Sequence, residues 1–553
     1  MKKKKYLIYG AMFLLLGNSC KKADFVEDNT NPNILYGIEP QEQFLNTAIQ
    51  IHGQDFEAFY DSYRRIMPWM QMNTAQNGNA KTFLNDVGNF NSRYGIFYPT
   101  LGAQIADLNA LIALKPESER PAYVHMAAIA EIVKSYYGFY VSDINGSLAY
   151  SEAFQGRYGG TLTPKYESQQ ELFQIFETKL KESIATLKAT QPVTQVSLGN
   201  NDLWFKGEAV KWVRVANALR LRIAMRLLKR DEATAKAIFA DVLADGEQMA
   251  SNADGWVLYA DETFTSGGNW DITTFRAPKP TVDFMLKNSD PRVRLYYQPN
   301  NYSEENFEIA KDSGLYPANA VWNPNQYVGA PISPDDATGA YQSWFTVKRV
   351  SASLSLDTLS FLNYRMWQPA NNGGDGVVTL PLITYADYCF MRAEIAARGL
   401  ASGNAEEWYN KGIEASITFF DNAGSIAKLA NYRQLSADEI DNYKNAADVK
   451  FNAAKAVEQI AIQQYINFYK QPNEAWALFK RTGIPNKNTA LANVDLIIDA
   501  SVRQIPRRAA LSIPAATDLN AANKQAALDA MAQDADFGSG PTDLFGRVWW
   551  DKK

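Results

Sequence analysis

The sequence predicts a mainly α-helical protein with one large core. Apolar residues recur at three- and four-residue spacings along most of the chain, which is the pattern of helices that bury one face. Hydrophobic residues make up 46% and charged residues 21% of the 553 residues, so the chain can bury a core without disulfides or metals. The helical pattern covers residues 43–51, 55–70, 92–114, 122–141, 168–187, 206–229, 231–249, 385–398, 405–420, 453–468 and 473–479.

The N-terminus predicts a lipoprotein signal peptide over residues 1–19. Residues 2–5 are lysines, and residues 6–17 form an apolar stretch shorter than the roughly 20 residues that span a bilayer. Small residues then precede Cys20, as in bacterial lipoprotein signals, although Gly17 stands where leucine is usual. We expect acylation of Cys20, which would anchor the protein to a membrane. The alternative is an ordinary secretory peptide with a coincidental cysteine.

Residues 20–38 are predicted to be the lipidated cysteine and a flexible tether. The segment is polar and contains Asn-Thr-Asn-Pro-Asn, a run of turn-forming residues. Its acidic residues Asp24, Glu27 and Asp28 could direct export to the cell surface, while Lys21 and Lys22 dilute that charge. Display on the outer face is therefore a hypothesis.

Two later regions differ in composition and in hydrophobic periodicity. Residues 385–398 and 405–420 are helical segments separated by Gly399 and Gly403, which predicts a helical hairpin and a scaffold similar to tetratricopeptide repeats. Between residues 255 and 381, Gly, Pro, Asn, Ser and Trp are dense and long helical patterns are absent. Long irregular segments in a folded protein are usually functional, so we expect the binding region there.

Seven motifs, in order along the chain, resemble those of the SusD/RagB family in its SusD-like branch. The helix motif at 211–226 is the most similar, and Ala149 replaces a proline that is usual in the first motif. The motifs lie at residues 143–153, 211–226, 290–292, 393–399, 476–485, 505–508 and 548–551.

This resemblance implies a single SusD-like domain over residues 39–553, with tetratricopeptide-like helical hairpins and an irregular, loop-rich half. It also implies a lipid-anchored protein of the outer membrane that faces the cell exterior, captures a glycan or peptide and delivers it to a SusC-like TonB-dependent transporter. A glycan or oligosaccharide is the main expectation. A peptide-binding RagB-like protein, a surface glycosidase or peptidase, and a helical adaptor without a ligand remain alternatives.

Aromatic side chains are the candidates for ligand contact, because their rings stack on apolar ligand faces with few rotatable bonds. Trp270, Trp322 and Tyr327 lie in the loop-rich region, and Trp69 follows Pro68 near a helix end, where the resemblance implies a binding aromatic. Ordinary packing is the alternative for each. The arginines of the 206–229 helix, with Arg507 and Arg508, are instead expected to tie helices together through carboxylates.

The residues for most catalytic chemistries are missing. The chain has two histidines, His52 and His125, and no zinc-spaced cysteines, phosphate loop or nucleophile elbow. We therefore predict no catalytic residue, metal or cofactor. Cys389 is expected to lie in the core. Asp335 and Asp336 are expected to be solvated, and calcium binding by this pair is the less favoured alternative. A net charge of −5 without a long basic stripe makes nucleic acid an unfavourable partner.

Overall fold

A computed structural model describes residues 37–79 and 90–553 of the protein. The predicted signal peptide, Cys20 and most of the tether lie outside these residues. Each of the eleven predicted helical segments contains helix in the structure, with boundaries that shift by a few residues. The prediction of a mainly helical protein is therefore confirmed. Among the described residues, no helix is long and apolar enough to cross a membrane.

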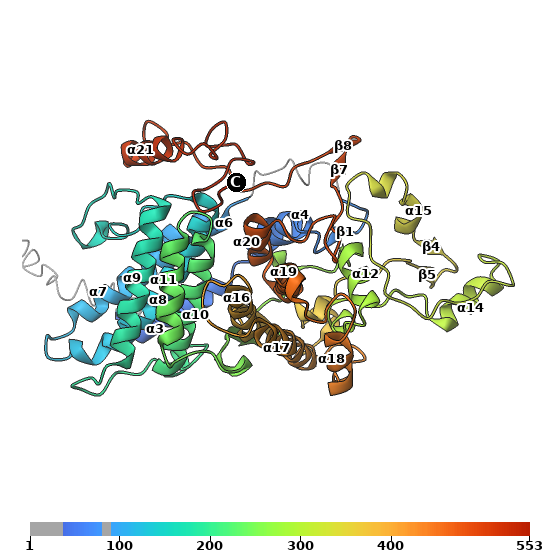
Figure 1. Ribbon diagram of the computed structural model, residues 1–553, viewed down its shortest axis with the longest axis horizontal. Coiled ribbons are helices and arrows are strands. Elements are labelled where there is room, and N and C mark those ends of the chain that lie inside the picture. The colour runs from blue at the N-terminus through green and yellow to red at the C-terminus, as the bar shows by residue number, and fades with distance from the viewer. Residues whose placement is uncertain (1–36, 80–89) are drawn as a thin grey trace, which may run out of the picture.

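Long helices that pack in chain order form the first half of the molecule (Figure 1). Helices α8, α9, α10 and α11 follow one another side by side, and α3 packs on α7. Ser168 and Asp231 cap the first turns of α9 and α11, respectively, with their side chains. The helical elements of the chain up to residue 244 are α3 (Pro40–His52), η1 (Glu57–Ile66), α4 (Met67–Trp69), α6 (Ser92–Ile96), η2 (Phe97–Leu101), α7 (Gly102–Leu114), η3 (Arg120–Tyr123), α8 (Val124–Asn145), η4 (Gly156–Tyr158), α9 (Gln169–Lys188), η5 (Gly199–Asn201), α10 (Ala209–Leu227) and α11 (Glu232–Ala244). Of these, η1 packs against α20, and α4 lies beside α20 (Figure 1).

A second group of helices lies toward the C-terminus. The predicted hairpin is present, because α16 and α17 pack on each other, and Gly399 ends the first helix with a positive φ of 65°. The helices of this group are α16 (Tyr385–Ala397), α17 (Ala405–Ile426), α18 (Ala437–Lys444), η11 (Ala453–Lys455), α19 (Ala456–Asn467), η12 (Phe468–Lys470), α20 (Pro472–Thr482) and α21 (Ala521–Met531).

The region between the two helical groups is built from short elements, as the change in sequence texture predicts. Its helices are η6 (Asn252–Asp254), η7 (Gly268–Trp270), α12 (Lys279–Lys287), α13 (Val293–Tyr296), α14 (Glu304–Asp312), η8 (Asp336–Thr338), α15 (Gln342–Phe345), η9 (Tyr364–Met366) and η10 (Asn371–Gly373). The strands of the described chain are β1 (Thr74–Ala75), β2 (Trp256–Ala260), β3 (Phe275–Arg276), β4 (Lys348–Arg349), β5 (Ser355–Leu356), β6 (Val378–Ile383), β7 (Ile497–Ile498) and β8 (Ser501–Val502).

The strands form antiparallel pairs, β1 with β3, β2 with β6, β4 with β5 and β7 with β8. The pair β2–β6 closes the loop-rich region at its base, because Trp256 lies opposite Ile383 and Ala260 lies opposite Val378. The sequence analysis did not predict this pair. Because β2 and β6 pair, the two ends of an irregular segment of more than a hundred residues lie side by side in the helical body.

Buried ion pairs cross-link the helices through α10, and the prediction for its arginines is confirmed. Arg222 donates to Asp387 on α16. Arg226 donates to Asp143 on α8 at 3.2 and 3.1 Å and to Glu474 on α20 at 2.8 Å. The partners belong to three helices that lie far apart in the sequence, so α10 acts as the hub of the helical frame.

The C-terminal arginines and the lone described cysteine also have structural roles. Arg507 pairs with Asp551, and Arg508 donates to the backbone oxygens of Asp543 and Gly540. Cys389 is buried, as predicted, and burial raises the pKa of its thiol to about 12.

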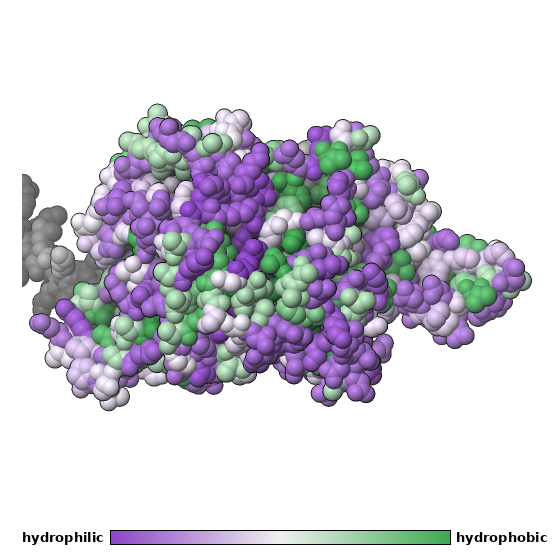
Figure 2. All heavy atoms as spheres, in the orientation of Figure 1, coloured by the Kyte–Doolittle hydropathy of each residue, from purple (hydrophilic) through white to green (hydrophobic). Residues whose placement is uncertain are grey.

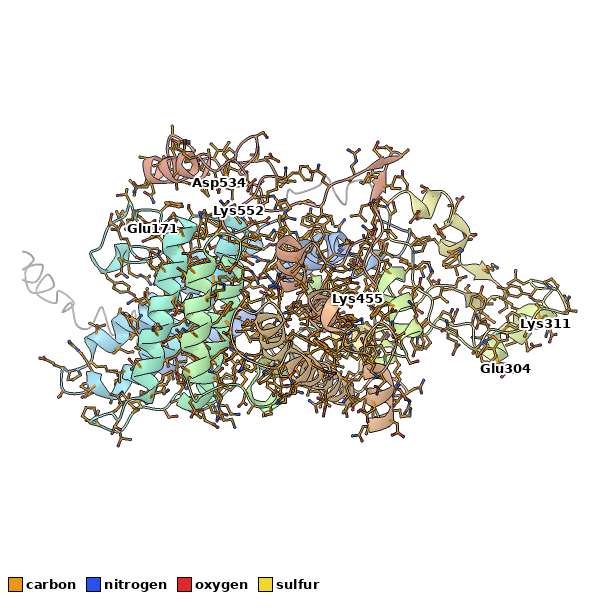
Figure 3. The ribbon with its side chains drawn as sticks, in the orientation of Figure 1. Glu171, Glu304, Lys311, Lys455, Asp534 and Lys552 are labelled. Carbon is orange, nitrogen blue, oxygen red and sulfur yellow. The ribbon has the colours of Figure 1, made fainter. Side chains whose placement is uncertain are left out.

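Part of the loop-rich region projects from the body as an arm that comprises α14 and the β4–β5 hairpin (Figure 1). Glu304 and Lys311 of α14 lie near its end (Figure 3). The face shown in Figure 2 is largely hydrophilic, and one of its hydrophobic patches lies on this arm. Val321 is 88% exposed there, and Ile309, Leu315 and Val347 are also exposed.

Candidate functional site

The four aromatic candidates from the sequence do not form one site. Trp69 lies in the core, Trp270 lines one pocket, Trp322 belongs to the arm, and Tyr327 lines a different pocket. Only an accessible ring with polar neighbours can hold a nutrient, so the surroundings of each ring decide whether it can contact a ligand.

The structure contradicts ligand contact by Trp69. Its side chain has 0% exposure and packs against Phe90 and Trp476, with ring centroids 5.3 and 5.5 Å away. Pro68 places the ring at the last turn of the helix, and the turn points into the core rather than toward solvent. Trp69 is therefore a packing residue.

Trp270 is partly exposed and lines a narrow pocket of about 130 Å³ beside η1. The loop that carries it is held to the start of this helix, because the backbone and side-chain amides of Asn269 both donate to Asp55. Lys470 also lines the pocket and donates to the carbonyl oxygen of Met366. Burial lowers the pKa of Lys470 to about 7. The small volume suits one ring or side chain rather than an extended ligand.

Trp322 is fixed in the arm. Its indole Nε1 donates to the carbonyl oxygen of Tyr302 at 2.7 Å, and Tyr302 in turn contacts Tyr316 ring to ring at 6.3 Å. The ring is partly exposed next to the exposed Val321. This arrangement stabilises the arm, and one face of the indole remains available at the surface.

Tyr327 lines a cavity of about 360 Å³, which we call the Tyr327 pocket. The cavity combines tyrosine rings, side-chain amides and guanidinium groups, the mixture that fixes a polar ligand with flat apolar faces. It lies between the end of α13, the η9 segment and the turn after α17. The lining residues are Arg294, Leu295, Tyr297, Gln298, Pro299, Tyr327, Asn363, Tyr364, Arg365, Leu429, Ala430, Asn431, Tyr432 and Arg433.

Backbone pairing positions two sides of the Tyr327 pocket. Tyr297 forms an antiparallel bridge with Leu362, the Gln298 N–H donates to the carbonyl oxygen of Phe361 at 2.9 Å, and the Asn363 N–H donates to the carbonyl oxygen of Tyr296 at 2.8 Å. The third side is the turn after α17, where Asn431 has a positive φ of 57°. Asparagine tolerates this conformation better than most residues, which explains its use in the turn.

Four tyrosines line the pocket, of which Tyr297 is buried, and hydrogen bonds orient two of the other three. Tyr432 donates its hydroxyl to Asp421 at 3.0 Å, and the Tyr364 hydroxyl accepts from Asn372 at 2.9 Å. The Tyr327 hydroxyl has no hydrogen-bond partner among the described residues, and partial burial raises its pKa. Tyr327 can therefore offer both a ring face and a free hydroxyl to a ligand.

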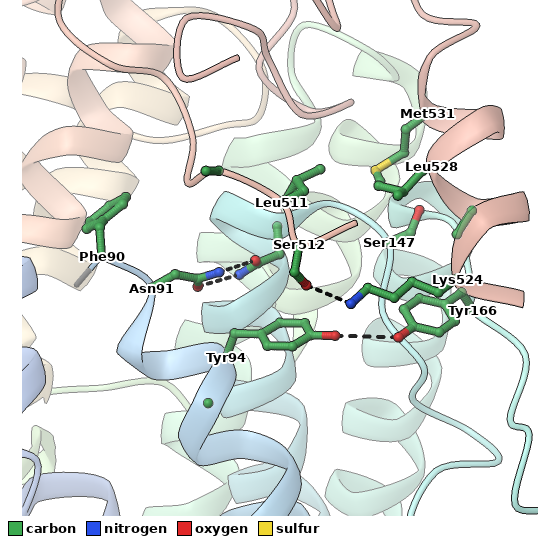
Figure 4. Close-up of a pocket in the computed structure, with 14 residues that line it drawn as sticks. Phe90, Asn91, Tyr94, Ser147, Tyr166, Leu511, Ser512, Lys524, Leu528 and Met531 are labelled. Atoms are coloured by element: carbon green, nitrogen blue, oxygen red, sulfur yellow. Dashed lines mark hydrogen bonds between the residues drawn. The ribbon is translucent and has the colours of Figure 1, made fainter. Parts of the chain in front are cut away.

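A further cavity, of about 290 Å³, lies under the C-terminal helix α21 (Figure 4). Its polar groups largely satisfy one another: Asn91 and Asn145 exchange amide hydrogen bonds at 2.7 and 3.0 Å, and Lys524 donates to Ser512 at 2.6 Å. Its two tyrosine hydroxyls, from Tyr94 and Tyr166, lie 3.4 Å apart. Because these polar groups already bond to one another, we infer that the cavity is part of the packing that holds the C-terminal segment. This favours the Tyr327 pocket as the binding site.

No catalytic or metal-binding arrangement is evident in the part of the chain that the structure describes. No group of three or more His, Cys, Asp or Glu side chains could hold a metal ion there. Asp335 instead accepts hydrogen bonds from the backbone amides of Asp499 and Ala500, so it fixes the β7–β8 turn. His52 is buried and accepts from the Trp204 indole at 3.0 Å, and burial lowers its pKa to about 3.

The sequence analysis missed Tyr364, Arg365 and Tyr432. Tyr364 and Arg365 lie within the predicted 255–381 binding region, but Tyr432 lies beyond it. Nothing in their local sequence distinguishes them from the other tyrosines and arginines of the chain. Tyr364 and Arg365 are placed by the long-range pairing of Tyr297 with Leu362, and Tyr432 by the turn after α17, neither of which sequence spacing reveals.

Comparisons with known proteins agree with this architecture. Residues 32–510 match a SusD-like family model described as starch-binding and associating with the outer membrane. Similar solved structures include a chitin-binding protein, with 22% identity, a TM-score of 0.69 and coverage of 93% of this chain and 100% of that one. A SusD homologue from Bacteroides fragilis has 19% identity, a TM-score of 0.66 and coverage of 94% and 100%.

A chitin-binding SusD homologue from Flavobacterium johnsoniae has 19% identity, a TM-score of 0.61 and coverage of 93% of this chain and 99% of that one. No curated protein sequence matches the chain. Structural likeness at these identities establishes the fold, and the family model establishes the family because it matches most of the chain. The chain therefore belongs to the SusD-like family of non-catalytic, nutrient-binding proteins that associate with the outer membrane.

Proposed function

We propose that the protein captures a glycan in the Tyr327 pocket at the cell exterior and delivers it to a SusC-like TonB-dependent transporter. The observation that carries this proposal is the lining of the pocket, in which the rings of Tyr327, Tyr364 and Tyr432 accompany the amides of Asn363 and Asn431. Tyrosine rings stack on the apolar faces of sugars, and amides pair with their hydroxyls.

A glycan is favoured over a peptide by two further observations. Two of the similar structures carry names that describe them as chitin-binding. The described chain also lacks a long exposed strand edge at the Tyr327 pocket, where an extended peptide could add by backbone hydrogen bonds. A peptide ligand of the RagB-like kind is the second candidate.

Attachment to the membrane is proposed through acylation of Cys20. Residues 1–19 would be removed, residues 20–38 would serve as the tether, and residues 39–553 would form the nutrient-binding domain. Several acyl chains on one cysteine bury enough CH₂ groups for stable anchoring, at about 0.8 kcal/mol each.

Binding and turnover are separated by titrating the purified protein with panels of oligosaccharides and peptides and then analysing each mixture for cleavage. We expect heat with an oligosaccharide and no new reducing ends. Tyr327→Ala should weaken binding by about 1–3 kcal/mol, the range of an interface hot spot, whereas Tyr259→Ala, at an exposed tyrosine of β2, should not. Cleavage of the ligand, or equal effects of both substitutions, would refute the proposal.

Delivery to a transporter requires a complex with the barrel. We expect solubilised outer membranes to yield a SusC-like protein together with this chain. Recovery of the barrel with no heat from any glycan or peptide would instead identify the chain as a helical adaptor.

A further inference from the structure

The charges around the Tyr327 pocket are unbalanced. Arg294, Arg365 and Arg433 line it, and no aspartate or glutamate does. Glu439 on α18 compensates for one of these charges from outside the cavity, because it accepts hydrogen bonds from both Arg294 and Arg433. The bond from Arg294 is the main cause that holds the pKa of Glu439 well below its usual range, so this carboxylate stays ionised.

Two other carboxylates near the pocket are engaged elsewhere. Asp421 accepts from the Tyr432 hydroxyl and from the Leu435 backbone amide. Asp375 pairs with Lys428 at 2.6 Å, and this pairing is the main cause that lowers the pKa of Asp375, with a smaller contribution from the charge of Arg365. Neither forms an ion pair with an arginine of the pocket, so the described part of the chain leaves the cavity with a surplus of positive charge.

Arg365 is the arginine without a carboxylate partner. Its Nη1 donates to the carbonyl oxygen of Lys428 at 3.0 Å, whereas Nε is buried without a hydrogen-bond partner within the described ranges. Nη2 forms no hydrogen bond to the described residues either. The Nε–Nη2 edge of a guanidinium is a fork that pairs with both oxygens of a carboxylate. A buried donor without a partner destabilises the empty pocket, and a ligand carboxylate at this edge would relieve that cost.

The same pocket supplies faces for a sugar ring. Arg365 follows Tyr364 in η9, and Tyr327 and Tyr432 line the same cavity, so the charged fork and the stacking rings act on one ligand. A cavity of about 360 Å³ holds one or two sugar units, so it can take the charged unit itself and not merely its neighbour.

We propose that the ligand of the Tyr327 pocket is an acidic glycan, in which a uronate carboxylate pairs with Arg365 while its ring lies against the tyrosines. This inference rests on the proposed function, because it names the class of glycan that the same site takes. It predicts that charge, rather than sugar type alone, selects the ligand.

The test is isothermal titration with two acidic probes, oligogalacturonate and hyaluronan oligosaccharide, each beside its methyl ester. A chitin oligosaccharide is the neutral comparison. We expect at least one acidic probe to bind, its methyl ester to bind about tenfold or more weakly, and the affinity to fall with added salt. Arg365→Met should lose the same factor for the acid and little for the ester, and Arg365→Lys should recover part of it.

The control variant is Arg349→Met, at an exposed arginine of the arm, which should bind like the unchanged protein. Circular dichroism of every variant checks that folding is intact. Equal binding of acid and ester, or binding of the chitin oligosaccharide alone, overturns the inference but leaves glycan capture standing. If neither acidic probe binds, the inference falls, and the neutral members of the glycan panel then decide whether glycan capture falls with it.

Discussion

Replacement of Arg226 by methionine probes the buried ion pairs that hold the helical frame together. The side chains of Arg226, Asp143 and Glu474 are only 5%, 7% and 5% exposed. Arg226→Met would remove both hydrogen bonds to Asp143 and the bond to Glu474. Glu474 would keep Arg222 at 3.5 Å, but Asp143 would keep no ion-pair partner among the described residues.

The expected loss in the free energy of unfolding follows from the charge of Asp143, which the substitution leaves without an ion-pair partner. Breaking a buried pair by removing one member typically costs 3–5 kcal/mol, because a charge is left uncompensated. We therefore expect Arg226→Met to lower the free energy of unfolding by about 4 kcal/mol. The matched control is Arg157→Met, which removes a surface pair with Asp107 in which the arginine is 67% exposed, and should lower the free energy of unfolding far less, because solvent screens an exposed pair.

Urea unfolding of the purified variants, followed by tryptophan fluorescence and far-ultraviolet circular dichroism, measures both costs. Adding Asp143→Asn to Arg226→Met neutralises the orphaned carboxylate, so the double variant should recover part of the lost stability. The reasoning would be refuted if Arg226→Met and Arg157→Met had the same cost, or if Asp143→Asn lowered the stability of Arg226→Met further.

Three further predictions concern stability and anchoring. Because burial lowers the pKa of Lys470 to about 7 from about 10.4 in the unfolded chain, the folded state binds fewer protons across that window, and stability should rise with pH. Lys470→Met should abolish this rise, about 2 kcal/mol between pH 7 and 9, in urea titrations; an unchanged pH slope would contradict it. Trp69→Ala should lower the free energy of unfolding by about 3–5 kcal/mol, because the ring is buried, whereas replacing the part-exposed Trp322 by alanine should lower it much less. Thermal unfolding of the two variants measures this difference. Cys20→Ser should move the protein from the membrane fraction to the soluble fraction, and a protein that stays in the membrane would exclude this anchor.

Local patterns predicted the helical frame well. The hairpin of α16 and α17 follows from two apolar stripes and the glycines between them, and each of these signals lies within a few residues of the element it describes. The arginines of α10 were also predictable in kind, because arginine on an apolar helix face needs a carboxylate nearby. The partners Asp387 and Glu474 were not predictable, since they depend on how distant helices pack.

The candidate site was predicted only in part, for the same reason. Tyr327 was identified from its loop, but its neighbours Tyr364 and Tyr432 reach the pocket through the pairing of Tyr297 with Leu362 and through the turn after α17. Trp69 shows the opposite error, because its position beside a proline near a helix end is compatible with either exposure or burial. Only the packing of Phe90 and Trp476 against its ring decides between them.

The central claim is that one pocket holds the nutrient by contact alone, and a crystal structure of the protein with a bound oligosaccharide tests it most directly. We expect intact sugar density against Tyr327, Tyr364 and Tyr432, with a carboxylate of the ligand beside Arg365. Sugar bound instead beside Trp270 or under α21, with the Tyr327 pocket empty, would contradict it.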